Sequence, residues 1–390
     1  MNIGVFFGSR SPEHDVSIIT GEFIISELKK LGHNISAVYI GKDGQWYCNE
    51  ELDSFKFFKE QGELHLKNYN KIFLDLEKSK GKIVLKEKGA FGKEYIFDLA
   101  FPAFHGSYGE DGTIQGLFEI FNVPYVGCDV ASSAITMDKI LTKQFYKELG
   151  IPTVDFIYFD HLDWQKDRNA IIQKSITELS WPVFVKPPKF GSSIGINKAT
   201  NKNELEAAIE VALHYGNRVL IEKGVANLKD LTCALLGNEN PKVSLVQESL
   251  FTDEIFSYED KYIVEGGTQL GNATSNLVIP ANIPENITKE IQELSIKIFK
   301  ELGCSGTSRV DFLYDQVAKK LYSTEVNTLP GTLYNHLWKA SGIEMKDLLS
   351  ELISLALEKN KKANGLVKTF QSNILEFANS VKLKIKEEQS

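Results

Sequence analysis

Two carboxylates and an amide in the last quarter of the sequence could bind a divalent cation. Asp311 lies in the segment RVDFLYD, and Glu325 and Asn327 lie two residues apart in STEVNTLPG. On a strand, Glu325 and Asn327 would point to the same face. Their oxygen atoms suit Mg²⁺ that also holds substrate phosphates. Polar side chains on an exposed edge strand would give the same pattern, so both interpretations stay open from these residues alone.

Arg309 precedes Asp311 by two residues, so on a strand the two side chains would share a face. Arginine is rare in this chain, because only four of the 44 basic residues are arginine. A guanidinium beside metal ligands is suited to stabilise charge that develops on an oxyanion. The pattern therefore favours a catalytic role for Arg309.

A loop rich in glycine and serine could hold phosphate groups. The segment KPPKFGSSIGINKAT follows the strand-like PVFVK, so a strand would end at Lys186 and present its ammonium to phosphate oxygens. Gly191 and Gly195 would let the backbone approach a ligand closely, and Ser192 and Ser193 would add hydrogen-bond donors. A flexible surface turn would have the same composition.

Lys139, at the start of the helical pattern MDKILTK, is a second candidate for phosphate contact, with a solvated lysine as the alternative. The commoner nucleotide motifs GxxxxGK[ST] and GxGxxG do not occur, and the first strand–helix turn reads FFGSRSPEHDVS. The kinase motifs HRD and DFG are missing as well. The sequence thus argues against a dinucleotide-dependent oxidoreductase.

The elements that must position these residues form an α/β pattern. The opening strand at 3–7, a helix from 16 to 31 and a strand at 34–40 predict a doubly wound parallel sheet. A hairpin is expected at 81–98 within a lysine-rich insertion, before a buried strand at 99–104. Further strands are expected at 154–159, 183–187, 218–224, 231–237, 242–251, 308–315 and 320–327, and helices at 137–150, 169–179, 203–215, 284–302 and 343–358.

Composition limits the classes of protein that fit. A chain of 390 residues predicts two or three domains, and 43% hydrophobic with 25% charged residues is typical of a globular protein. The net charge of -8 argues against nucleic acid as a partner. No apolar stretch is long enough to span a bilayer, so no membrane partner is expected. The four cysteines have no metal-binding spacing and indicate a reduced compartment, which predicts a cytoplasmic protein.

Several segments together resemble those of D-alanine–D-alanine ligases, a family of the ATP-grasp superfamily. FFGSRSPEHDVSIITG is similar to the family's N-terminal GGxSxExxVSxxSG, with Ser9 in place of the second glycine. HGSYGEDGTIQGLFEIFNVPYVG is similar to HGxxGEDGxxQGxLE…PYxG. SSAITMDKILTK, VFVKPPKFGSSIGI, SRVDFLYD and EVNTLPG follow in the family's order. The resemblance covers about residues 3–358.

The resemblance implies a three-domain ATP-grasp architecture that holds ATP between the second and third domains. The expected divisions are an N-terminal domain at 1–136, a central domain with the phosphate loop at 137–228, a C-terminal domain with the metal site at 229–360, and an appended helix or tail at 361–390. The implied quaternary structure is a homodimer.

The resemblance also implies the reaction, which supplies D-alanyl-D-alanine for peptidoglycan synthesis. The carboxylate of one D-alanine attacks the γ-phosphate of ATP to give an acylphosphate, and the amine of a second D-alanine displaces the phosphate. The implied cofactors are ATP and two Mg²⁺ ions, with Mn²⁺ as a substitute metal. Such an enzyme mainly positions its reactants and neutralises phosphate charge.

Residue roles follow from the resemblance position by position. The implied catalytic residues are Glu13, Ser192, Tyr262, Arg309 and Gly331. The implied substrate-binding residues are His105, Lys261 and His336. The implied ATP-binding residues are Lys139, Lys186, Gly191, Ser193, Gly195, Glu222, Lys223, Val225 and Asp230. The implied metal ligands are Asp311, Glu325 and Asn327.

The chain departs from the family in three segments. Asp230 stands where a glutamate usually contacts the ribose, and FSYEDKY replaces FYDYxxKY around Lys261 and Tyr262. After NTLPG the chain reads TLYNHLWKASG, without the serine and YP-like dipeptide that grip the second substrate. His336 falls at about that serine and could donate to a carboxylate, or be a polar residue at a helix start. The alternatives are therefore another acceptor, such as D-serine, D-lactate or another amino acid, and a nucleotide-binding homologue without catalysis.

Overall fold

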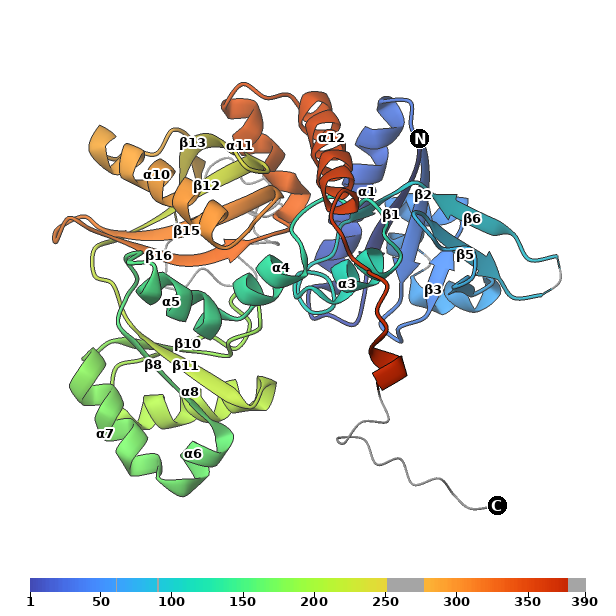
Figure 1. Cartoon of the computed structure of the whole chain (residues 1–390). Helices are drawn as coiled ribbons and strands as arrows, with labels where there is room; N and C mark the ends of the chain where they lie inside the picture. The colour runs from blue at the N-terminus through green and yellow to red at the C-terminus, as the bar shows by residue number, and fades with distance from the viewer. Residues whose placement is uncertain (61, 90, 251–276, 378–390) are drawn as a thin grey trace, which may run out of the picture.

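The computed structural model describes residues 1–60, 62–89, 91–250 and 277–377 (Figure 1). Within these residues the chain forms four β-sheets with helices packed around them. The expected mixed α/β class is therefore confirmed. Among the described residues, no helix combines the length and apolar composition that crossing a bilayer requires.

The N-terminal sheet has the strand order β3-β2-β1-β7. β1 pairs in parallel with β2 and β7, as expected, whereas β3 joins antiparallel at the edge. β1 is buried almost throughout, because helices and the insertion cover its two faces. The bounds here are β1 Asn2–Gly8, α1 His14–Lys30, β2 Asn34–Ile40, β3 Trp46–Cys48, β7 Leu99–Pro102, α3 Thr113–Ile120 and α4 Val130–Met137.

The insertion between β3 and β7 contains the expected hairpin, extended to a three-stranded sheet in the order β4-β5-β6. Phe97 of this sheet meets Phe6 of β1 edge to face at a ring-centroid distance of 6.0 Å. The insertion therefore contributes to the hydrophobic core of the N-terminal sheet. The bounds are η1 Glu50–Asp53, α2 Phe55–Glu60, η2 Glu63–Asn68, β4 Ile72–Leu74, β5 Ile83–Glu87 and β6 Glu94–Phe97.

The second sheet is antiparallel, with the order β10-β9-β11-β8. Apolar residues of α7 and α8 form one buried cluster with its strands. Lys186 is the last residue of β9, and the glycine- and serine-rich segment connects β9 to β10, as the sequence predicts. The bounds are α5 Lys139–Glu148, β8 Phe156–Asp160, α6 His161–Lys166, α7 Arg168–Leu179, β9 Val183–Lys186, β10 Asn197–Ala199, α8 Lys202–Tyr215 and β11 Arg218–Lys223.

The third sheet has the order β14-β13-β12-β15-β16 and is antiparallel. In Figure 1, α5 lies below β16, between this sheet and the second one. The long central strands β12 and β15 carry the buried apolar residues that pack against α10. The bounds are β12 Leu228–Gly237, β13 Lys242–Ser249, β14 Leu277–Val278, α10 Glu285–Glu301, β15 Gly306–Asp315, β16 Lys320–Asn327, η6 Gly331–Tyr334, α11 Asn335–Ala340 and α12 Met345–Asn364.

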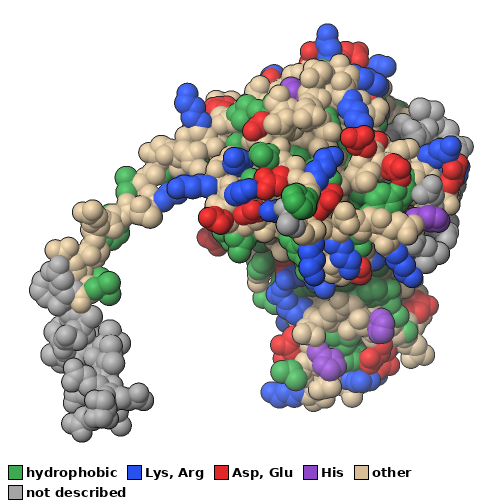
Figure 2. Space-filling view, turned by 90° about the vertical axis from the view of Figure 1, so that its right-hand side faces the viewer, with side chains coloured by type: hydrophobic (Ala, Val, Ile, Leu, Met, Phe, Trp, Pro, Cys, Tyr) green, Lys and Arg blue, Asp and Glu red, His purple; other side chains and the backbone are tan. Residues whose placement is uncertain are grey.

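The C-terminal segment differs from the expected elements in where its helix ends. α12 continues past the expected end at 358 to Asn364, so the expected boundary at 360 falls inside a helix. The described residues that follow form a tail with the 3-10 helix η7 Ile374–Phe377, and this tail extends away from the body (Figure 2). The expected boundaries at 136 and 228 lie at the end of α4 and the start of β12. The division into domains stays a prediction.

Candidate active site

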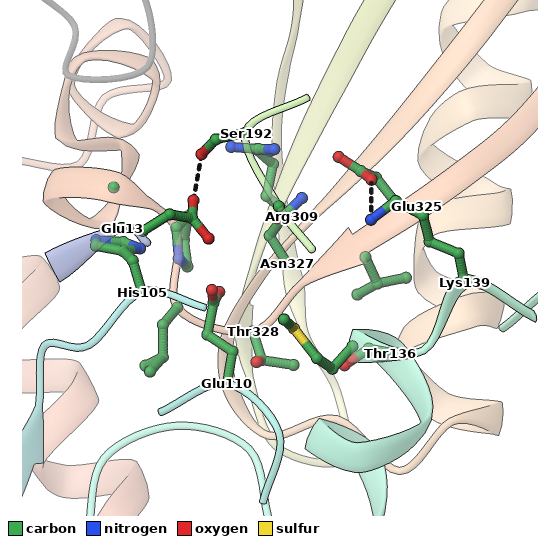
Figure 3. Close-up of a pocket in the computed structure, with 16 residues that line it drawn as sticks. Glu13, His105, Glu110, Thr136, Lys139, Ser192, Arg309, Glu325, Asn327 and Thr328 are labelled. Atoms are coloured by element: carbon green, nitrogen blue, oxygen red, sulfur yellow. Dashed lines mark hydrogen bonds and ion pairs between the residues drawn. The ribbon is translucent and has the colours of Figure 1, made fainter. Parts of the chain in front are cut away.

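One pocket gathers residues from all three expected domains (Figure 3). Its walls come from the start of α1, the loop after β7, the α4–α5 junction, the β9–β10 loop, and β15, β16 with the residues that follow. Nine of the predicted site residues line it. They are Glu13, His105, Lys139, Gly191, Ser192, Arg309, Glu325, Asn327 and Gly331.

The β9–β10 loop contacts the N-terminal domain through a hydrogen bond from the Ser192 hydroxyl to the Glu13 carboxylate. Ser192 and Ser193 have φ values of 52° and 59°, a left-handed turn that aims the loop at Glu13. A Cβ at Gly191 would lie 2.7 Å from Glu13 Oε2, so only glycine lets the loop come this close. Two of the residues predicted as catalytic, Glu13 and Ser192, are therefore in direct contact.

His105 is buried behind Glu13. Its Nε2 lies 2.8 Å from the Thr20 hydroxyl oxygen, and its carbonyl oxygen accepts from Ser11 Oγ at 2.7 Å. Burial, with the positive charge of Arg309 nearby, lowers the pKa of His105 to about 3. The imidazole is therefore neutral at pH 7 and can act only through its neutral tautomers.

Glu110 lines the same pocket although the sequence analysis did not select it. Its Oε2 accepts from the Gly106 amide at 2.6 Å. Burial, together with the negative charge of Glu13, raises the pKa of Glu110 to about 8. The raised pKa favours the protonated carboxyl, which can donate a hydrogen bond. The sequence feature that could have identified Glu110 is its position in the segment HGSYGEDG, which also contains the predicted residue His105.

The buried Arg309 and the partly buried Asp311 form a two-pronged ion pair on β15. Arg309 Nε donates to Asp311 Oδ1 at 2.8 Å, and its terminal nitrogen Nη2 donates to Oδ2 at 2.6 Å. The guanidinium carbon lies 4.9 Å from the ring centroid of Tyr334, which adds a cation–π contact. Burial opposes charging of Arg309, but the Asp311 charge raises its pKa well above the ordinary value. The cation is therefore fixed in one orientation.

The predicted metal ligands are neighbours on β15 and β16. Asp311 pairs in register with Glu325, and Arg309 with Asn327. The amide of Asn327 donates to Asp311 Oδ2 at 3.1 Å. Among the described residues there is no group of three or more His, Cys, Asp or Glu side chains suited to a metal ion. Two carboxylates and one amide oxygen fit Mg²⁺ only as a partial ligand set, which a phosphate-bearing ligand would complete.

Lys139 begins α5 and reaches across to β16. Its Nζ lies 3.3 Å from Glu325 Oε2 and donates to the carbonyl oxygen of Phe190 at 2.9 Å. Asp138 accepts from the amides of Ile140 and Leu141 and so caps the helix, which fixes where Lys139 begins. Lys139 thereby joins the β9–β10 loop to Glu325, one of the predicted metal ligands. This arrangement excludes the alternative of a solvated surface lysine.

Lys186 and Glu222 do not line the pocket but pair with each other. Lys186 Nζ donates to Glu222 Oε2 at 2.7 Å, and the buried Lys143 lies 3.0 Å from Oε1. Burial alone would raise the pKa of Glu222, but the two lysines lower it to about 2. Glu222 is therefore ionised at neutral pH. Lys143 was not among the predicted residues, although it lies one helical turn after Lys139.

The segment after β16 turns sharply beside Arg309. Gly331 lines the pocket, and Thr332, Leu333 and Tyr334 all have φ near 50°, which is rare for residues with a side chain. His336 follows on α11, where its Nε2 lies 2.7 Å from Gln247 Oε1. His336 does not line the pocket.

His336 is neutral at pH 7, because burial and the Arg309 charge lower its pKa to about 4. Its Nδ1 is buried and has no hydrogen-bond partner among the described residues. A role in binding the acceptor stays a prediction, and it would be that of a neutral donor.

Five more predicted residues belong to the described part of the chain and lie outside the pocket lining. Ser193 and Gly195 belong to the β9–β10 loop, Lys223 ends β11, Val225 lies between β11 and β12, and Asp230 is on β12. None of these five lines the pocket. Lys261 and Tyr262 lie outside the described residues.

Two family models cover most of the chain. Residues 2–128 match the model described as D-ala D-ala ligase N-terminus, and residues 145–354 match D-ala D-ala ligase C-terminus. A D-alanine--D-alanine ligase of Thermosipho melanesiensis is 37% identical over 96% of this chain and 98% of its own length. A D-alanine--D-alanine ligase from a Thermoanaerobacter strain is 41% identical over 92% of this chain and 97% of its own length.

Solved structures of D-alanine-D-alanine and D-Ala:D-Ser ligases resemble this chain as well. The D-alanine-D-alanine ligase of Coxiella burnetii has a TM-score of 0.76 and 29% identity, covering 94% of this chain and 97% of that one. The VanG D-Ala:D-Ser ligase of Enterococcus faecalis has a TM-score of 0.77 and 31% identity, covering 91% and 99%. These matches confirm the ATP-grasp fold that the motifs predicted. Together with the family models, they establish that the chain belongs to the D-alanine–D-alanine ligase family.

Proposed function

We propose that this protein joins two molecules of D-alanine at the expense of ATP, giving D-alanyl-D-alanine, ADP and phosphate. The observation that carries the proposal is the single pocket in which the Glu13–Ser192 contact, the Lys139–Glu325 contact and Arg309 meet (Figure 3). The names of the relatives support the choice of substrate. Family membership supports ATP as the second reactant.

Glu13 would bind the ammonium group of the first D-alanine. Its carboxylate lies at the pocket wall, where Ser192 holds it in place. This would leave the substrate carboxylate facing the phosphate loop and Lys139. Attack of that carboxylate on the γ-phosphorus forms the new O–P bond while the bond to ADP breaks, and holding the two groups in line supplies much of the acceleration.

Arg309 and the Gly331 amide would stabilise the second step. The amine of the acceptor forms a bond to the activated carbonyl carbon, loses a proton, and phosphate leaves with the electrons of the C–O bond. Negative charge develops on the carbonyl oxygen during this attack. Arg309 is already fixed by Asp311 and Tyr334, so it would provide a preorganised positive charge at little reorganisation cost.

Asp311, Glu325 and Asn327 would hold Mg²⁺, with Mn²⁺ as a substitute. The metal would neutralise phosphate charge and orient the triphosphate. Lys139 and Lys186 would add positive charge to the same phosphates, with Ser193 and Gly195 in the loop. The nucleotide base and ribose would lie near Glu222, Lys223, Val225 and Asp230.

We further propose the three-domain division at 136/137 and 228/229, a homodimer, and a cytoplasmic enzyme of peptidoglycan synthesis. The support for these statements is family membership and, for the division, the fact that the pocket is lined by residues from strands or loops of three of the four sheets.

The test is ADP formation by the purified protein with ATP, Mg²⁺ and a panel of acceptors, with products identified by mass spectrometry. Predominant D-alanyl-D-alanine is expected. If D-alanine elicits no ADP while another amino or hydroxy acid does, the proposed substrate is wrong. Tight ATP binding without turnover on any acceptor would support a non-catalytic homologue instead.

A different acceptor is a second candidate because of the segment TLYNHLWKASG. His336 occupies about the position where the family has a serine, and its Nδ1, which has no partner in the described part of the chain, leaves hydrogen-bonding capacity there. The same panel with D-serine and D-lactate decides between the candidates. A mixed product in which D-serine exceeds D-alanine at the second position would favour this version.

A further inference from the structure

Lys143 carries a positive charge that the catalytic steps above do not use. Its side chain is 1% exposed and lies one turn after Lys139 on α5. The ammonium contacts Glu222 Oε1 at 3.0 Å and donates to Thr153 Oγ1 at 2.9 Å. The ring centroid of Phe156 lies 5.7 Å away. A fully buried lysine is uncommon and is kept only where partners compensate for its lost hydration.

The two oxygens of Glu222 are divided between two lysines. Oε1 faces Lys143 and Oε2 accepts from Lys186. Glu222 is 3% exposed, so neither oxygen is compensated by bulk water. These two ammonium groups, on α5 and β9, are the charges that lower the pKa of Glu222. A carboxylate oxygen has two lone-pair directions, so each can still accept one further hydrogen bond.

The two lysines differ in how firmly they are held. Lys186 ends β9 beside the phosphate loop, and its side chain is 17% exposed. In the proposed reaction its ammonium turns to the triphosphate, and Glu222 then loses that partner. The ammonium of Lys143 is held by Thr153 and Glu222, and Lys143 does not line the pocket. It is therefore the counter-charge that stays with Glu222 during turnover.

We propose that Lys143 is a positioning residue that keeps Glu222 fixed as a hydrogen-bond acceptor for the amino group of adenine while Lys186 binds phosphate. The inference rests on the proposed function, since it assumes that ATP is the nucleotide. Lys143 contacts no reactant. It acts through Glu222 and so determines affinity for the nucleotide and selectivity for its base.

The test compares Lys143→Met, Lys143→Arg, Glu222→Gln and the double variant Lys143→Met/Glu222→Gln with ATP and inosine triphosphate. Inosine carries a carbonyl oxygen where adenine has its amino group, so it cannot donate to a carboxylate. Lys147→Met is the matched control, because Lys147 is exposed on the same helix and its ammonium lies 4.2 Å from the centroid of the same Phe156 ring. Each variant is measured for ADP formation, for direct nucleotide binding and for thermal unfolding.

Lys143→Met is expected to raise KM for ATP about 10- to 100-fold, the factor that corresponds to one charge-assisted hydrogen bond. The effect on kcat should be smaller, and the preference for ATP over inosine triphosphate should fall towards one. Lys143→Arg should restore part of the preference. The two side chains are proposed to act as one unit. The loss of ATP affinity in the double variant should therefore be no larger than the loss in the more impaired of the two single variants.

Additive losses in the double variant, or an unchanged preference for ATP in a folded Lys143→Met protein, would overturn the proposal. If Lys143→Met does not fold, the Lys143→Arg and Glu222→Gln variants still report base preference, and an unchanged preference in both overturns it. Failure of the proposed function has a different signature. Wild-type protein would then form no ADP with any acceptor, whereas nucleotide binding by the variants could still be compared.

Discussion

The close approach of the phosphate loop to Glu13 makes Gly191→Ala a sharp test of the site. The added methyl carbon would lie 2.7 Å and 3.0 Å from the two carboxylate oxygens of Glu13. Ordinary van der Waals contact begins at 3.4 Å, so the shorter contact is about 0.7 Å too close. Glu13 is 5% exposed and has little room to retreat. The loop must therefore move away and weaken the hydrogen bond from Ser192.

A shift of this size should reduce kcat/KM about 100-fold, because misplacing reacting groups by ~1 Å costs a factor of that order. The loss should appear with D-alanine as the varied substrate, because Glu13 is the proposed ammonium site. Thermal unfolding should change little, since the loop contributes few buried apolar contacts. The assay is steady-state ADP formation with D-alanine varied at saturating ATP.

Gly216→Ala is the matched control for Gly191→Ala. No heavy atom of the described residues lies within 4 Å of the position where its methyl group would be, and its φ of 179° is an extended conformation that any residue adopts. This variant should keep wild-type activity and gain about 0.5 kcal/mol of stability, because alanine restricts the unfolded chain. If Gly191→Ala retains wild-type kcat/KM, the contact between the loop and Glu13 does not position the substrate, and the reasoning about this pocket fails.

Three further predictions concern charge. Arg309→Lys keeps the charge but loses the two-pronged geometry, so kcat should fall about 100-fold, and an unchanged kcat would remove Arg309 from the second step. Lys139→Met should raise KM for ATP about 10-fold in the same assay, whereas an effect confined to D-alanine would reassign this lysine. Burial, with Asp53 nearby, raises the pKa of Glu22 from 4.5 to about 8, so the folded state binds more protons than the unfolded state in this window and stability falls as pH rises. Glu22→Gln should therefore raise the free energy of unfolding by about 4 kcal/mol at pH 8 and by little near pH 4, and denaturant unfolding at the two pH values measures this.

Much of the fold could be predicted because its local signals agree. The segment NISAVYI is predicted as a strand at 34–40, and the structure has β2 at Asn34–Ile40. The hairpin at 81–98 was equally clear, since two apolar alternations flank a glycine-containing turn. Element ends were less predictable. α12 runs to Asn364 because its exposed, lysine-rich last turns still favour helix, and the period of the apolar residues gives no stop signal there.

Site residues could be predicted where they lie in a recognisable motif. Residues whose role depends on contacts made only in the folded structure could not be predicted from the sequence. Nothing in the sequence pairs Lys186 with Glu222, because the contact arises from the antiparallel register of β9 and β11. Glu110 was inside a recognised motif, but its raised pKa is a consequence of burial beside Glu13, which only the tertiary structure creates. Lys143 lacks any sequence signal beyond its helical spacing from Lys139. Burial distinguishes it from an ordinary surface lysine.

The charges of the site are balanced before any ligand is bound. Each of three basic side chains has an acidic partner: Lys139 with Glu325, Lys186 with Glu222 and Arg309 with Asp311. Leaving these groups buried without partners would cost several kcal/mol per ion, so pairing keeps the empty site stable. In the proposed reaction, the charges of two Mg²⁺ ions would balance the charge of a fully ionised ATP. The complex of metal and nucleotide would therefore carry little net charge when it binds to a site that also carries little net charge. Binding would then exchange two of the ion pairs: Glu325 would turn from Lys139 to metal, and Lys139 and Lys186 would turn from carboxylate to phosphate, while Asp311 would keep Arg309 as its partner. Glu222 is the exception, because no metal replaces Lys186 there, and Lys143 supplies the charge that this exchange would otherwise remove.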